Sequence, residues 1–142
     1  MSITKIFALL FLLITTEVLH AKDILGKRIN DAILALGTEY SRTQDGPVTK
    51  LTYAPVTINH PTLGKITEYD QYDFLNDVCE ARHTFIPRSY KKDFIDYLNT
   101  KFGYSDNLWR GDNDTYITIR QHDDDFELVI WTQTYEAMRD NR

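Results

Sequence analysis

The segment between Tyr116 and Trp131 constrains the fold most, because it fits only one kind of local structure. Two runs of alternating apolar and polar residues flank the short polar loop His122–Asp125. Such a pattern predicts an antiparallel hairpin with one buried face. With this loop, four apolar side chains share that face: Ile117, Ile119, Leu128 and Ile130. A shift of one residue would turn them to water, so the register is strongly specified.

The opposite face of this hairpin carries the candidate binding residues. In the same register Arg120 lies opposite Glu127, which favours the pairing electrostatically, and Tyr116 lies opposite Trp131. An aromatic patch on an exposed sheet face is typical of an interaction surface. We therefore predict a binding surface with four members: Tyr116, Arg120, Val129 and Trp131. The alternative is that this face packs against another segment of the chain.

The rest of the chain predicts an α+β domain over residues 22–142. An apolar stripe predicts a helix from Leu25 to Leu36, and a second helix is expected after Pro87, with Ser89 as its N-cap. Strands are expected at 48–54, 65–74, 79–86, 107–110, 115–121 and 126–134. Residues 38–47 are expected to be turns, and those after Tyr135 a frayed polar tail.

This order, α-β-β-β-α-β-β-β, predicts two amphipathic helices packed on one face of an antiparallel sheet of about six strands. Both helices end in glycine, at Gly37 and Gly103, and similar residues follow each of them. A degenerate internal duplication explains this similarity. The general preference for glycine at helix ends also explains it, and we favour this explanation.

The first 21 residues read as a secretory signal peptide. Lys5 precedes an apolar run from Ile6 to Ile14, and a polar stretch follows, ending at Ala21. A membrane-spanning helix needs about 20 apolar residues, so this run is too short to span. Cys79 is the only cysteine and lies far from the cleavage point, which argues against a lipid anchor. The sequence therefore predicts a secreted or periplasmic protein without a membrane span.

Charge and cysteine content exclude several other functions. The net charge of −5 argues against nucleic-acid binding, which needs clustered Lys and Arg. A single cysteine leaves no intramolecular disulfide and no CxxC motif. The histidines show no zinc-ligand spacing, and the aspartates near Asp112 and Asp123 match no calcium loop. We therefore expect no metal and no cofactor.

A carboxylate–imidazole pair is the one candidate for catalysis. If residues 65–86 form a hairpin with a two-residue loop, Asp70 lies opposite His83, a pair that could orient a general base. A three-residue loop would instead place Asp70 opposite Arg82, and the sequence does not decide between the two registers. Cys79 and His83 form a C-x₃-H string, but on a strand they lie about 13 Å apart, too far for a dyad.

The string GKRINDAILALG, Gly26–Gly37, followed by strands with Tyr53, Tyr69 and Tyr72, resembles the opening of a group of small exported bacterial domains. The group includes the β-lactamase inhibitor protein type and the small lipoprotein of outer-membrane assembly. The resemblance implies a binding or scaffold module with helices on an antiparallel sheet. Thr38 stands near the position where the family often has proline, and no functional residue is carried over.

These observations favour an exported, non-catalytic protein that binds another protein or an envelope component. One alternative is a small extracytoplasmic hydrolase or ligand-binding enzyme that uses Asp70 and His83. The other is an acidic inhibitor or immunity-type protein, whose charge would suit a basic target.

Overall fold

The computed structural model describes residues 24–60 and 64–140, so the predicted signal peptide, residues 1–21, lies outside the described residues. The described elements are, in chain order, α2 (Ile29–Leu36), β1 (Tyr40–Asp45), β2 (Val48–Tyr53), β3 (Val56–His60), β4 (Gly64–Leu75), β5 (Val78–Pro87), η1 (Arg88–Tyr90), α3 (Lys91–Phe102), β6 (Trp109–Arg110), η2 (Asp112–Asp114), β7 (Tyr116–Gln121), β8 (Asp125–Trp131) and α4 (Gln133–Asp140).

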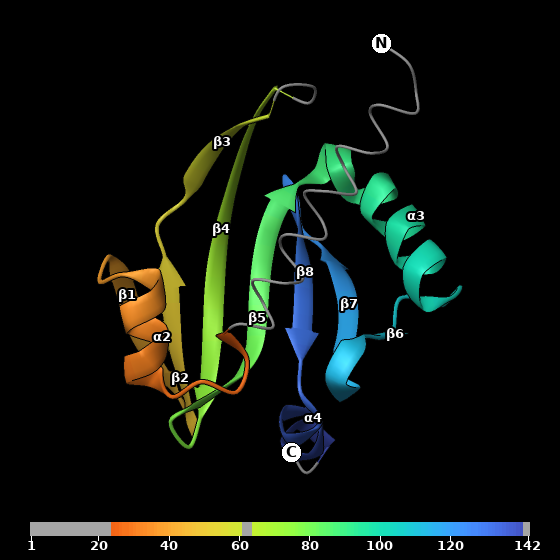
Figure 1. The fold of residues 1–142 in the computed structure, drawn as a ribbon. Coiled ribbons are helices and arrows are strands. Elements are labelled where there is room, and N and C mark those ends of the chain that lie inside the picture. The colour runs from red at the N-terminus through yellow and green to blue at the C-terminus, as the bar shows by residue number, and fades with distance from the viewer. Residues whose placement is uncertain (1–23, 61–63, 141–142) are drawn as a thin grey trace.

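An antiparallel sheet of eight strands organises the molecule (Figure 1). Its main path runs β1-β2-β4-β5-β8-β7-β6, and β3 pairs with β4 beside that path. The long strand β4 serves two neighbours, because β2 pairs with Gln71–Leu75 and β3 pairs with Gly64–Glu68. The predicted α+β class is therefore confirmed.

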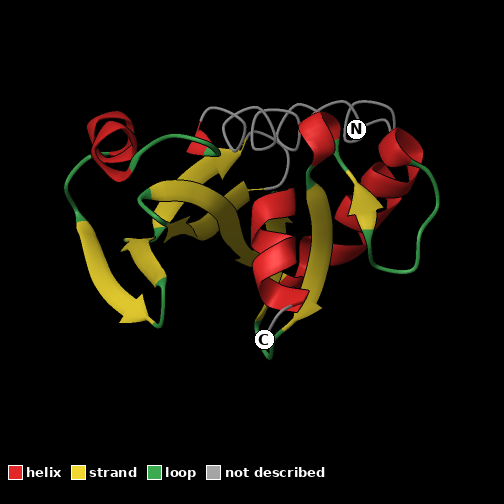
Figure 2. Cartoon of the chain, turned by 90° about the horizontal axis from the view of Figure 1, so that it is seen from below, coloured by secondary structure: helices red, strands yellow, loops and turns green. Residues whose placement is uncertain are grey.

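Two helices cover one face of the sheet, which we call the first face (Figure 2). Ile29 and Ala32 of α2 pack over β2, β4 and β5, on a cluster with Leu51, Tyr72, Phe74 and Cys79. Phe94, Tyr97 and Leu98 of α3 pack over β7 and β8. That second cluster contains the four side chains predicted to be buried: Ile117, Ile119, Leu128 and Ile130.

The sheet has two strands more than predicted, β1 and β3, and β1 arises from polar sequence. Residues 40–45 form β1, which pairs with β2 across the turn at Gly46-Pro47, although we expected turns here. This strand lies at the sheet edge and is exposed from Ser41 onward, so no alternation of apolar residues marks it. β3 follows Pro55 and lies between the predicted strands 48–54 and 65–74, where no strand was predicted.

The helix boundaries also differ from the prediction. The first helix begins at Ile29 rather than Leu25, because Gly26 adopts a positive φ of 87° and residues 26 and 27 pair with the backbone of Cys79. The Gly26 amide donates to the Cys79 oxygen, and the Cys79 amide donates to the Lys27 oxygen. The second begins at Lys91 after a 3₁₀ turn, and no side-chain bond from Ser89 caps it. The expected polar tail forms α4, so the order of elements departs from the expected repeat.

The predicted register of the last hairpin is confirmed throughout. Tyr116 pairs with Trp131, and Arg120 pairs with Glu127. The final strand ends at Trp131, three residues earlier than expected.

Neither predicted register holds along the whole β4–β5 hairpin. Next to the turn Phe74 pairs with Cys79, as a two-residue loop predicts. A β-bulge at Glu80 then shifts the pairing by one residue, so that Asp73 pairs with Ala81 and Gln71 with His83. The bulge leaves Glu80 unpaired in the ladder, where its backbone oxygen accepts a hydrogen bond from the Thr132 amide. It thereby fixes the junction between β8 and α4.

Candidate functional site

Two of the four predicted binding residues are buried, which corrects the expectation of an exposed aromatic patch. Val129 and Trp131 are each 2% exposed, on the face opposite α2 and α3, which we call the second face. Tyr135 of α4 packs against them, and the indole nitrogen of Trp131 donates a hydrogen bond to Glu136. The segment that we expected to be a loose tail therefore covers this part of the sheet.

Tyr116 and Arg120 lie at the margin of the covered region. The ring of Tyr116 stacks on Trp131 with centroids 5.7 Å apart, and the Arg110 guanidinium lies 4.5 Å from the Tyr116 centroid on the same strand pair. Arg120 is 51% exposed and reaches Glu127, with Nη1 to Oε2 at 3.5 Å. Of the predicted site, these two side chains are the ones that solvent reaches.

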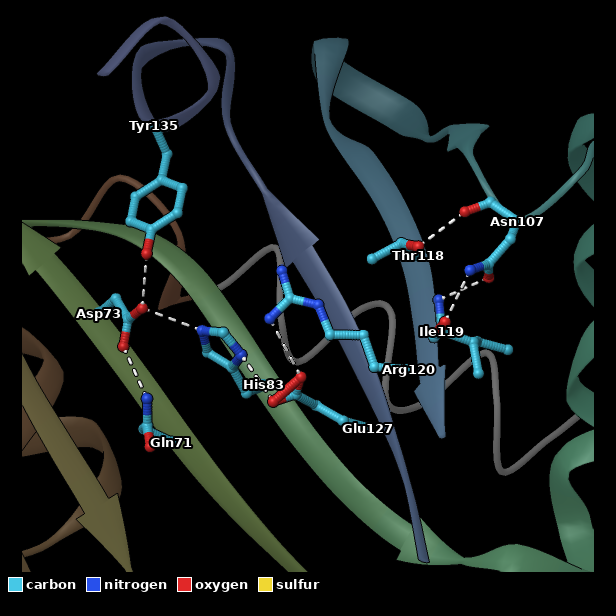
Figure 3. A network of polar contacts seen from close by, with 9 residues as sticks. All are labelled: Gln71, Asp73, His83, Asn107, Thr118, Ile119, Arg120, Glu127 and Tyr135. Carbon is cyan, nitrogen blue, oxygen red and sulfur yellow. Dashed lines mark hydrogen bonds and ion pairs between the residues drawn. The ribbon is translucent and has the colours of Figure 1, made fainter. Parts of the chain in front are cut away.

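The structure brings together a different set of charged residues at the centre of the second face (Figure 3). His83 lies between two carboxylates: its Nε2 is 2.9 Å from Asp73 Oδ2, and its Nδ1 is 3.4 Å from Glu127 Oε1. Gln71 Nε2 and the Tyr135 hydroxyl each donate a hydrogen bond to Asp73. His83, Asp73 and Glu127 are all buried, so β4, β5 and β8 share one buried ionic cluster.

The proton affinities follow from this arrangement. Burial by itself would lower the pKa of His83, but the hydrogen bonds and charges of Asp73 and Glu127 outweigh it and raise the pKa from 6.5 to about 9. Burial would likewise raise the pKa values of Asp73 and Glu127, yet contact with His83 holds both below their ordinary values. His83 is therefore a buried cation at neutral pH, and the two carboxylates are ionised.

The predicted pairing of Asp70 with His83 is wrong, because the bulge at Glu80 places the two on opposite faces of the sheet. Asp70 lies opposite Thr84 instead. Its Oδ1 accepts hydrogen bonds from Arg82 Nη2 at 3.0 Å and from Thr84 Oγ1 at 2.7 Å.

This geometry does not supply the usual elements of acid–base catalysis. Both ring nitrogens of His83 face carboxylates, so neither is left to accept a proton from a substrate. Cys79 is buried on the first face, and burial raises the pKa of its thiol. Across residues 24–60 and 64–140, no group of three or more His, Cys, Asp or Glu side chains is arranged to hold a metal ion.

An aromatic stack lies further along the second face, away from α4. The rings of Tyr69 and Phe85 are nearly parallel, 5° apart, with centroids separated by 4.3 Å. His122 extends the stack at 5.8 Å from Phe85. Burial, and then the charges of Asp125 and Glu127, raise the pKa of Tyr69. We call Tyr69, Phe85 and His122 the aromatic stack.

The sequence could not identify this stack. Tyr69 and Phe85 are direct neighbours only because the bulge shifts the register, and both predicted registers separated them. The alternation of aromatic and polar residues along 69–74 was the available signal, and it leaves the choice of partner open.

A shallow cavity adjoins the aromatic stack at Tyr69. It has a volume of about 540 Å³ and lies where β2 ends and β3 begins. Tyr40 and Tyr53 line it together with Tyr69, and Glu39 is the one charged residue in its lining. The Tyr53 hydroxyl donates a hydrogen bond to the Gly37 oxygen, which holds one wall in place.

Comparison of the chain with known protein families, with curated proteins and with solved structures gave no match. In the described part of the chain, no helix combines the length and the apolar character needed to cross a membrane.

Proposed function

We propose that this chain is an exported, non-catalytic binding protein, and that its partner is a basic protein segment that docks on the aromatic stack. This proposal joins the leading hypothesis from the sequence with the acidic-inhibitor alternative. Export rests on the signal-peptide pattern of residues 1–21. Binding rests on the uncovered part of the second face.

The observation that carries the proposal is the half-buried Tyr69–Phe85 pair, whose faces are nearly parallel at 4.3 Å. Aromatic rings supply contact area and lose little rotamer entropy on binding, so they anchor interfaces well. Arg120 and Tyr116 would then form the rim of the interface.

Charge favours a basic partner over an acidic one. The loop beside the stack contains three successive aspartates, Asp123–Asp125, and the net charge of the chain is −5. Two exposed cations on this face, Arg110 and Arg120, are already paired with Asp114 and Glu127. A Lys or Arg side chain of the partner could lie over an aromatic face, within reach of these carboxylates. Such a complex should form faster at low ionic strength.

The test is capture of partners from the exported protein fraction with the tagged mature protein. We expect wild type and Tyr104→Ala to recover the same basic protein, because Tyr104 is 89% exposed and lies on the loop after α3. Tyr69→Ala should lose it. Equal recovery by all three proteins would exclude the aromatic stack as the site.

A second measurement tests the charge argument without knowledge of the partner. Titration with oligolysine, followed by NMR, should shift the amide signals of residues near Tyr69 and Asp125, and oligoglutamate should not. Added salt should weaken the oligolysine effect. Shifts spread evenly over the acidic surface would count against a defined site.

The export proposal has its own test. Mass spectrometry of the protein recovered from outside the cytoplasm should give a chain that begins at Lys22. A chain that retains Met1–Ala21 would contradict the signal-peptide prediction.

A further inference from the structure

β1 forms one open edge of the sheet (Figure 1). It pairs with β2 on one side, and its residues from Ser41 to Asp45 are all exposed. An unprotected edge strand presents amide and carbonyl groups that can pair with another strand. In an antiparallel hairpin, every second residue directs these groups away from its partner strand. A row of backbone donors and acceptors therefore faces outward along β1.

β3, which pairs only with β4, forms a second edge, and at the far end of the main strand path a side chain occupies part of the edge of β7. There the Asn107 side chain takes the place of a strand beside β7 (Figure 3). Its Nδ2 donates to the Ile119 oxygen at 2.8 Å, and its Oδ1 accepts from the Ile119 amide at 3.0 Å. The Thr118 hydroxyl also donates to the backbone oxygen of Asn107. Within residues 24–60 and 64–140, no side chain is seen to pair with the outward backbone groups of β1 in this way.

We propose that β1 pairs antiparallel with β1 of a second copy of this chain, about a twofold axis at Thr43. The two sheets then form one continuous sheet, with α2 of each copy on the same side. Thr43 lies opposite Thr43 of the second copy. Arg42 lies opposite Gln44 of the second copy, and Ser41 lies opposite Asp45.

The side chains of β1 select this register. Residues that face the same side of a continuous sheet must pair with each other, so only every second register is allowed. One neighbouring register places Arg42 opposite Arg42 of the second copy, and like charges directly opposite each other are destabilising. The other, centred on Gln44, pairs only three residues of the strand. The register centred on Thr43 pairs five, with no like charges and with a Thr–Thr pair at its centre.

Backbone geometry agrees with the same register. The two-residue turn at Gly46-Pro47 makes Asp45 and Val48 a hydrogen-bonded pair, so Thr43 also directs its amide toward β2. Arg42 and Gln44 then direct theirs outward, and the proposed register places them opposite each other.

The contact is small, so the dimer should be weak and reversible. Stable interfaces bury about 1,200 Å² or more, and a pairing of short edge strands provides less than this. We therefore expect dimers at high protein concentration and monomers on dilution.

The decisive experiment is disulfide formation by Thr43→Cys. In the proposed dimer residue 43 lies in a non-hydrogen-bonded pair, in which Cα atoms are about 4.5 Å apart, within the range a disulfide bridges. Cys79 is buried and should not interfere. The matched control is Thr57→Cys, an exposed threonine on β3. Under glutathione oxidation, Thr43→Cys should form covalent dimers at least tenfold faster. Equal rates would overturn the proposal.

Sedimentation velocity gives a second test that needs no oxidation. Wild type should show a sedimentation coefficient that rises with concentration. Thr43→Arg places two like charges at the axis and should weaken the dimer at least tenfold, whereas Thr57→Arg should not. A dimer that persists in Thr43→Arg, or wild type that stays monomeric at millimolar concentration, would show that β1 is not the interface. The proposal is independent of the aromatic stack, so either can fail alone.

Discussion

Tyr135 in α4 donates a hydrogen bond of 2.9 Å to Asp73 in β4, across 62 positions of the chain. The accepting oxygen, Asp73 Oδ2, also contacts His83, so this bond links the C-terminal helix directly to the buried ionic cluster. The same helix covers Trp131. Docking of α4 and the integrity of the cluster should therefore be coupled.

Tyr135→Phe should loosen α4 without disturbing the rest of the sheet. The substitution removes one hydrogen bond to a charged acceptor, which typically contributes about 1.5–3 kcal/mol. We expect a lower free energy of unfolding in urea and faster amide exchange in residues 133–138. Tyr104→Phe is the matched control, because Tyr104 is 89% exposed. Unchanged exchange in α4 would contradict the tether.

The buried cation at His83 should make stability depend on pH. The pKa of His83 is raised from 6.5 to about 9, so its contribution is complete below pH 6.5 and is lost as the pH rises through 9. The pKa values of Asp73 and Glu127 are lowered from 3.8 and 4.5, so their contribution is present above these values and is lost as the pH falls. Urea unfolding should show maximal stability between about pH 5 and 6.5.

His83→Gln isolates the alkaline part of this profile. The variant leaves two buried carboxylates without their cation, which costs about 3–5 kcal/mol. The loss of stability between pH 6.5 and 9 should disappear with it. His122→Gln, an exposed histidine, should keep the wild-type profile. If both variants retain the alkaline loss, another group is responsible.

Sequence patterns sufficed where contacts are close along the chain and apolar. The β7–β8 hairpin has a short loop and a clear alternation, so its register and its buried face followed directly. The cluster under α3 followed for the same reason. β1 was missed because its polar residues face solvent on both sides, and only its hydrogen bonds to β2 make it a strand.

The candidate site was harder to predict, since it depends on one inserted residue. The bulge at Glu80 separates Asp70 from His83. It instead brings Asp73 beside His83 and places Tyr69 opposite Phe85. No local pattern marks the bulge, because its stabilising contact is with Thr132, 52 residues later. α4 was missed for a related reason: it is short and polar, and long-range contacts hold it in place.

Trp131→Ala should act on stability rather than on binding alone. Trp131 is 2% exposed, and removal of a buried tryptophan side chain typically costs about 3–5 kcal/mol. We expect a large decrease in the free energy of unfolding in urea. Trp109, the tryptophan that remains in the variant, should become more accessible to acrylamide if part of the protein is unfolded. A Trp131→Ala protein as stable as wild type would show that α4 does not cover this side chain.

Asn107 should protect the β7 edge of the sheet. Asn107→Gly keeps the positive φ of 66° available and removes both side-chain bonds to Ile119. We expect a loss of about 1–2 kcal/mol, since two backbone groups lose their partner, and faster aggregation at 37 °C followed by light scattering. The stability and the aggregation rate of Asn107→Asp should fall between those of wild type and Asn107→Gly, because the aspartate retains the acceptor for the Ile119 amide. Asn113→Gly is the control, with a similar positive φ of 55° at an exposed position. Equal aggregation rates for the Asn107→Gly and Asn113→Gly proteins would mean that the Asn107 side chain does not guard this edge.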